Sequence, residues 1–166
     1  TRVLIKDVKG IRFAFMAYTE MVNGLESVLT PEDLDAMVNI IDEEKMKEDI
    51  IYAKDNNADV IIAYLHWGDE YSRIQAQRQE ILADMLFRSG VDIILGSHPH
   101  VIQPTQTLDY DGKTKFIAYS MGNFLSNQRV ETLVPYGMSE QVSKYTEDGI
   151  IIDIEIEKKG STKEIS

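Results

Sequence analysis

Apolar and polar residues follow two different periods along this chain, and the changes between them separate strands from helices. Residues 3–8 (VLIKDV) and 11–18 (IRFAFMAY) flank Lys9-Gly10, a pattern typical of two strands joined by a tight turn. The second run is apolar at nearly every position, which predicts a strand covered on both faces. Residues 58–65 (ADVIIAYL) and 91–96 (VDIILG) predict two further buried strands.

Helical patterns fill the intervals between these strands. Thr30-Pro31 resembles an N-cap followed by a first-turn proline, so a short helix is expected there. Two longer helices are predicted, one over about residues 43–57 after the cap Asp42 and one over about residues 75–88 before Gly90. Their expected core residues are Met46, Ile50 and Ala53 in the first and Ile81, Leu82, Met85 and Leu86 in the second. This alternation of strand and helix predicts an α/β fold with parallel strands and crossover helices.

The last third of the chain predicts antiparallel structure. Residues 101–110 and 113–120 lie on either side of Asp111-Gly112, a sequence that favours a hairpin turn. Residues 122–146 are predicted to form a loop, and residues 149–159 alternate as a half-solvated strand does. Residues 160–166 are expected to be a frayed or truncated end. A chain of 166 residues is long enough for one core, so a single domain is expected.

Composition narrows the classes of function. The net charge is -11 and the pI is near 4.7, so the basic stripes that bind phosphate backbones are absent and no nucleic-acid partner is expected. No run of about 18 apolar residues occurs and the first ten residues lack a signal-peptide core, so we expect the chain as it stands to be soluble. The sequence has no cysteine, and any metal must therefore bind through nitrogen and oxygen.

All three histidines of the chain fall in two short strings. His66 follows the third predicted strand, whereas His98 and His100 follow the fourth and are separated by a proline that fixes its own φ. Ligands gather beyond the carboxyl ends of the strands in an α/β sheet, and these two strands are expected to be neighbours. We therefore expect three imidazoles in one crevice, forming part of the coordination shell of one or two divalent metal ions.

Four nearby side chains each have two interpretations. Asp69 and Glu70 either accept hydrogen bonds from imidazole N–H groups or are solvated loop charges. Trp67, the sole tryptophan, either forms a wall of the crevice or packs in the core. Asn123 follows another predicted strand and either reaches the crevice or makes a simple turn with its own backbone.

Four strings and the predicted helix with Gln79 carry a resemblance to a known family. The strings are FAFMAYTEMVNG, HWGDEY, GVDIILGSHPHVIQP and IAYSMGNFLSNQ. Over residues 8–128 the chain resembles the C-terminal half of the bacterial capsule synthesis (poly-gamma-glutamate synthesis, CapA-type) family, which is similar to calcineurin-like metallophosphoesterases. The resemblance implies a partial metallophosphoesterase-like α/β sandwich, with a mixed sheet and crossover helices. It also implies that residues 1–166 are the C-terminal portion of a single domain whose N-terminal half lies upstream.

The metallophosphoesterases bind two metals with motifs in a fixed order, and only the last of these motifs match this chain. His66 matches a lone histidine that follows a strand, and His98 and His100 match a final His-x-His pair. The early aspartate motif, the bridging carboxylate and the Asn-His motif have no counterpart. The resemblance thus implies divalent metal ions in the whole protein, but weak metal binding and no catalytic residue in this chain.

What the resemblance implies about function leaves three alternatives. The first is a component of capsule or poly-gamma-glutamate biosynthesis or export that is a metal-dependent phosphoesterase-like hydrolase when whole and inactive as this chain alone. The second is a non-catalytic scaffold or polymer-binding partner of a ligase or transport complex, and the third is hydrolysis of an unrelated phosphodiester or peptide bond.

The family also implies partners and a location. The expected partners are the capsule polymer or its synthesis and export complex. The expected location is the cell surface, with membrane anchoring only through a segment upstream of Thr1. Half a sandwich would leave one apolar sheet face uncovered, so we also expect that this chain can form a homodimer.

Overall fold

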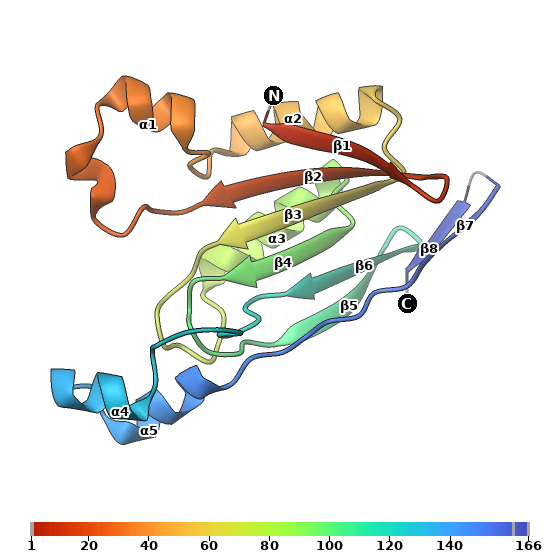
Figure 1. Cartoon of the computed structure of the whole chain (residues 1–166). Coiled ribbons are helices and arrows are strands. Elements are labelled where there is room, and N and C mark those ends of the chain that lie inside the picture. Colours follow the sequence, from red (N-terminus) through yellow and green to blue (C-terminus); the bar gives the residue numbers. More distant parts are fainter. Residues whose placement is uncertain (1, 161, 166) are drawn as a thin grey trace.

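The computed structural model describes residues 2–160 and 162–165, and over these residues the core is a six-stranded mixed sheet (Figure 1). Its strands are β1 (Val3–Val8), β2 (Ile11–Thr19), β3 (Val60–His66), β4 (Ile93–Ser97), β5 (Thr105–Tyr110) and β6 (Lys113–Ala118). Their spatial order is β1-β2-β3-β4-β6-β5. The four central strands are parallel, and β1 and β5 pair antiparallel at the two edges. The predicted α/β class, with a mixed sheet and crossover helices, is confirmed.

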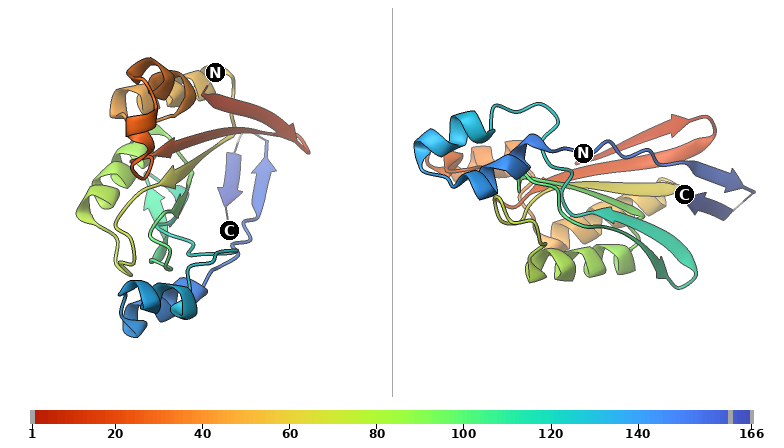
Figure 2. Two further views of the ribbon diagram at one scale, coloured as in Figure 1. Left: turned by 60° about the vertical axis from the view of Figure 1, so that its left-hand side comes forward. Right: turned by 90° about the horizontal axis from the view of Figure 1, so that it is seen from below.

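The two longer helices cover one face of this sheet (Figure 2). They are α2 (Glu43–Asp55) and α3 (Gln77–Ser89), and a short helix α1 (Pro31–Met37) and a 3-10 turn η1 (Leu25–Val28) precede them. Asp42 caps α2 by accepting hydrogen bonds from two backbone N–H groups, as predicted. The prediction that Ile81 faces the core is wrong: its side chain is 59% exposed, because α3 turns Leu82, Ala83 and Leu86 toward the sheet. Over the described residues, no helix is both long and apolar enough to cross a bilayer.

The opposite face of the sheet is only partly covered, so the prediction that β2 is buried on both faces is wrong. Ala14, Met16 and Tyr18 are buried under the helices, but Phe15 on the other face is 37% exposed. Tyr64 of β3 is similarly exposed on that face. An apolar groove remains there between the sheet and the segment that leads to β7, and it is lined by Val8, Lys9, Ile11, Phe13, Ile62, Ile93, Leu95, Ile154 and Ile156.

The C-terminal third differs most from the sequence-based predictions. Residues 122–146, predicted as loop, contain four short helical pieces: α4 (Val130–Leu133), η2 (Val134–Tyr136), α5 (Glu140–Ser143) and η3 (Lys144–Glu147). Each is about one turn long, too short to produce a helical period in the sequence. The hairpin turns at Asp111-Gly112 as predicted, although β5 starts at Thr105 and leaves residues 101–104 outside the strand.

The chain ends in a second, smaller sheet. The predicted strand over residues 149–159 is confirmed only for β7 (Ile156–Lys159), which pairs antiparallel with β8 (Thr162–Ile165). The prediction of a frayed end is therefore wrong for residues 162–165, because the turn at Gly160 returns the backbone into a ladder with β7. Ser161 and Ser166 lie outside the described residues.

Gly96 in β4 brings the ends of three strands into close contact. A Cβ atom at this position would lie 2.0 Å from the Tyr119 carbonyl oxygen and 2.6 Å from the Trp67 indole nitrogen. The missing side chain leaves room for Trp67 Nε1 to donate a hydrogen bond of 2.9 Å to the Tyr119 carbonyl. The carboxyl ends of β3, β4 and β6 therefore meet at one point of the sheet edge.

Replacing Gly96 by alanine is expected to lower the free energy of unfolding by about 3 kcal/mol, because the new methyl group must displace the backbone. Gly10→Ala is the matched control: its Cβ would meet nothing within 4 Å, and only its positive φ of 83° is costly, by about 1 kcal/mol. Urea unfolding of both variants measures the difference. Equal losses of stability would contradict the close approach at Gly96.

Candidate metal centre

The three histidines meet at the carboxyl edge of the sheet, as the strand order predicts. His66 is the last residue of β3, and His98 and His100 lie in the loop after β4. His66 Nε2 lies 3.2 Å from His98 Nδ1, and the centroids of these two rings are 4.4 Å apart. The His98 and His100 centroids are 6.1 Å apart. One compact group of imidazoles therefore forms from residues that are far apart in the chain.

The backbone of the His-Pro-His loop is strained. His98 and His100 have φ values of 96° and 58°, which side chains with a Cβ rarely adopt. The buried Pro99 between them fixes its own φ, and its carbonyl accepts a hydrogen bond of 2.7 Å from the Tyr71 N–H. Such strain is typical of functional sites, where surrounding structure holds the backbone in place.

Hydrogen bonds define which nitrogen of His66 and His98 carries the proton. The Thr19 hydroxyl donates to the Met21 carbonyl at 2.5 Å, so its oxygen accepts from His66 Nδ1–H at 2.9 Å. The lone pair of His66 Nε2 then accepts a hydrogen bond from His98 Nδ1–H. His98 is left with its own lone pair at Nε2, the form that binds a metal ion.

Asn123 defines the proton position of His100 in the same way. Its Nδ2 donates to the Thr146 carbonyl at 2.9 Å, and its Oδ1 lies 3.0 Å from His100 Nδ1. Because an amide oxygen only accepts, His100 must carry its proton at Nδ1. Of the two interpretations of Asn123, the structure thus has the one in which the side chain reaches the histidines.

Glu70 supplies the carboxylate of this group. Its Oε1 lies 4.0 Å from His100 Nε2, and one ligand atom from each of Glu70, His98 and His100 falls within 4.8 Å of the others. His66 is outside this set of three and contacts it through His98. Two imidazole nitrogens and one carboxylate oxygen form a donor set that suits a divalent transition metal.

Burial lowers the pKa of His66, and the neighbouring His98 and His100 act in the same direction. Burial also lowers the pKa of His98, although the Glu70 carboxylate opposes that shift. The desolvated ring is more stable without its charge, so both imidazoles are neutral at pH 7. Neutral rings are what metal binding requires, because a protonated imidazole has no free lone pair.

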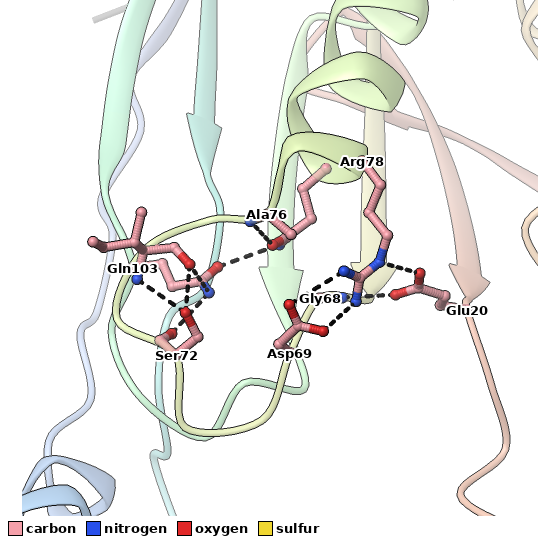
Figure 3. A network of polar contacts seen from close by, with 9 residues as sticks. Glu20, Gly68, Asp69, Ser72, Ala76, Arg78 and Gln103 are labelled. Carbon is pink, nitrogen blue, oxygen red and sulfur yellow. Dashed lines mark hydrogen bonds and ion pairs between the residues drawn. The ribbon is translucent and has the colours of Figure 1, made fainter.

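Trp67 and Asp69 take roles away from the histidines. Trp67 is 1% exposed and stacks on Tyr119 in the core, so it has the packing role rather than that of a crevice wall. Asp69 forms a two-point ion pair with Arg78, with its shorter distance at 2.7 Å. Arg78 also donates to Glu20, which in turn accepts from the Gly68 N–H (Figure 3).

Two buried glutamines, Gln79 and Gln103, fix the other side of the loop that carries Glu70. Figure 3 shows Gln103 beside Ser72. Gln79 is 1% exposed, and its amide accepts from the Ala76 N–H at 2.8 Å and donates to Gln103 at 3.2 Å. Gln103 then donates to the carbonyls of Ser72 and Ile74. Gln79 is among the features that resemble the family, but no local pattern indicates its contact with Gln103. For Glu20, its position directly after β2 is the available signal.

Because His66 and His98 are desolvated, NMR titration is expected to place both midpoints below the ordinary histidine value of about 6.5. The unfolded chain then takes up these protons at higher pH than the folded chain. The contribution of these two histidines to the free energy of unfolding should therefore be constant above about pH 6.5 and become unfavourable as the pH drops from there through the lower, folded pKa values. Midpoints at or above the ordinary value would contradict the burial of these rings.

Comparison with known proteins shows the family of this chain. Residues 1–128 match the family described as "Bacterial capsule synthesis protein PGA_cap". The chain is 34% identical over 130 residues to "Capsule biosynthesis protein CapA" of Bacillus anthracis, and 30% identical over 151 residues to "PGA biosynthesis protein CapA" of Bacillus subtilis (strain 168). These alignments cover 76% and 84% of this chain but only 30% and 36% of the two relatives, so the chain spans about a third of their length.

A solved structure shares the fold over nearly the whole chain. The crystal structure of a hypothetical protein from Thermus thermophilus superposes with a TM-score of 0.56 at 14% sequence identity. The superposition covers 99% of this chain and 60% of that chain. The family match extends over more than half of the residues and includes both histidine strings. This chain therefore belongs to the bacterial capsule synthesis family PGA_cap.

Proposed function

We propose that this chain is the metal-binding part of a capsule or poly-gamma-glutamate biosynthesis protein that works at the cell surface as a metallophosphoesterase-type hydrolase. The observation that carries this proposal is the convergence of Glu70, His98 and His100, whose ligand atoms lie within 4.8 Å of one another. The family match supplies the biosynthetic context. The capsule polymer or its synthesis and export complex is the proposed partner.

The donor set fits a catalytic divalent ion better than a structural one. Structural sites surround the ion with four protein ligands, whereas three protein ligands leave a position open for water or substrate. His98 and His100 would hold the ion through Nε2, since hydrogen bonds keep their protons at Nδ1. Glu70 would add the negative charge that imidazoles lack.

When bound, a divalent ion supplies Lewis-acid chemistry: it polarises a phosphoryl oxygen and makes a bound water more acidic. The chain's own residues orient the histidine rings and the Glu70 carboxylate. Thr19 holds the proton of His66 at Nδ1, and Asn123 holds that of His100 at Nδ1. The Arg78 ion pairs and the buried glutamines keep the loop that carries Glu70 in one conformation. The chain carries a net charge of -11, so an anionic polymer would approach this edge more readily with a metal bound.

A second candidate is a non-catalytic scaffold in the same pathway. It is favoured by the direct hydrogen bond between His66 and His98, since this bond occupies the Nε2 lone pair of His66 and removes one imidazole from the ligands available to a metal. The scaffold needs only the fold and the loops at the sheet edge. The two candidates differ in what the loss of one ligand does to polymer output.

Titration calorimetry of the purified chain with Mn²⁺ and with Zn²⁺ tests the metal centre. His98→Ala and Glu70→Gln are each expected to weaken binding at least tenfold, because each removes one of three ligands. Asp84→Asn is the matched control: this carboxylate on α3 pairs with Arg88 and lies outside the group of Glu70, His98 and His100, so binding should be unchanged. Absence of binding to the unaltered chain would contradict the proposal.

An experiment that distinguishes the hydrolase from the scaffold uses the whole protein in a cell that makes the polymer. If the site is catalytic, His98→Ala should abolish polymer output while the protein is still present at its normal level. If output stays normal with this variant, the scaffold is the correct function. Immunoblotting of the same cells controls for loss of the protein through unfolding.

A further inference from the structure

We propose that the side-chain amide of Gln128 competes with a metal ion for the lone pair at Nε2 of His100, and we call this amide the latch. Asn123 accepts the ring proton at Nδ1 and so leaves the lone pair at Nε2. The inference rests on the metal centre proposed above and describes how its occupancy is controlled. It concerns residues of the segment after β6, which contributes none of the three ligands.

The Asn123 side chain determines which ring nitrogen of His100 carries the proton. Asn123 Nδ2 donates to the Thr146 carbonyl, and this contact leaves the amide one orientation only. Its Oδ1 faces His100 Nδ1 at 3.0 Å and therefore accepts the ring's single N–H. His100 Nε2 is left as a bare lone pair.

The lone pair at His100 Nε2 already accepts a hydrogen bond from Gln128. Gln128 Nε2 lies 3.3 Å from His100 Nε2 and donates to it, because the ring nitrogen can only accept. The other end of the same amide accepts a hydrogen bond of 3.2 Å from the Tyr71 hydroxyl. The Tyr71 ring also stacks on His100, with centroids 6.0 Å apart. Tyr71 thus holds the amide with its donor end toward the imidazole.

Hydrogen bonding and metal coordination exclude one another at His100 Nε2. A single lone pair cannot accept the Gln128 N–H and bind an ion at the same time. The backbone of Gln128 is tied down separately, since its carbonyl accepts from the Thr146 hydroxyl at 2.7 Å. Release of the latch is therefore a rotation of one side chain, and Tyr71 loses its partner as the ion arrives.

The sizes of these effects follow from the bonds involved. Breaking one neutral hydrogen bond weakens binding by about threefold to tenfold, so removing the latch should strengthen metal binding by that factor. Removing Asn123 should act in the opposite direction, because loss of the partner that orients a ligating histidine typically weakens binding by about tenfold or more.

The experiment measures Mn²⁺ and Zn²⁺ binding to the full chain and three variants by titration calorimetry. Gln128→Ala is expected to bind at least about threefold more tightly, and Asn123→Ala about tenfold more weakly. Gln106→Ala, an exposed glutamine on the edge strand β5, is the control and should bind as the unaltered chain does. The ring nitrogen shifts of His100 by NMR, without added metal, should report the proton at Nδ1.

The outcomes separate the latch from the metal centre. If the unaltered chain binds metal and Gln128→Ala binds less than threefold more tightly, the latch is overturned and the metal centre stands. If neither protein binds metal, the metal centre fails and the latch fails with it. A His100 proton at Nε2 overturns the latch whatever the metal affinities are. Tighter binding by Gln128→Ala together with a proton at Nδ1 supports it.

Discussion

The close approach of backbones at Gly96 is the constraint on which the candidate site depends. With a hydrogen in place of a side chain, the Tyr119 carbonyl and the Trp67 indole can meet over β4, where any Cβ would lie 2.0 Å from the carbonyl. Three strands therefore end at the same level, and the loops that follow them start from one place. The register of β3 and β4 pairs His66 with Ser97, and the contact at Gly96 brings the chain after β6, which leads to Asn123, to the same place.

Uncharged polar groups hold the loop between β3 and α3 in its conformation more than ion pairs do. Gln79 and Gln103 are almost fully buried, and each amide has partners within the loop or in the other glutamine. A buried amide without partners is costly, so the loop has one low-energy path between β3 and α3. The Arg78 ion pairs lie nearer the solvent and add less, because water screens them. These hydrogen bonds and ion pairs thus determine the position of Glu70, which lies in the same loop.

Local patterns predict the framework of this protein well because each element has its own signal. Asp42 caps its helix, Asp111-Gly112 turns its hairpin, and the order of strands brings His66 and His98 to one edge. The same patterns failed where burial depends on what else packs there: β2 is apolar on both sides, yet one side is only partly covered. Contacts between distant residues, such as Arg78 with Glu20 or Gln128 with His100, leave no local signal, since each partner would look the same in an ordinary loop.

The left-handed backbones of His98 and His100 also bear on how this sequence can change. Glycine or asparagine would adopt φ values of 96° and 58° with less strain than histidine does, so at these two positions the residue that suits the proposed chemistry is not the one that suits folding. Selection for stability alone would drive both positions toward glycine or asparagine. In a relative that no longer needs the imidazoles, the relief of this strain would favour their replacement at these two positions.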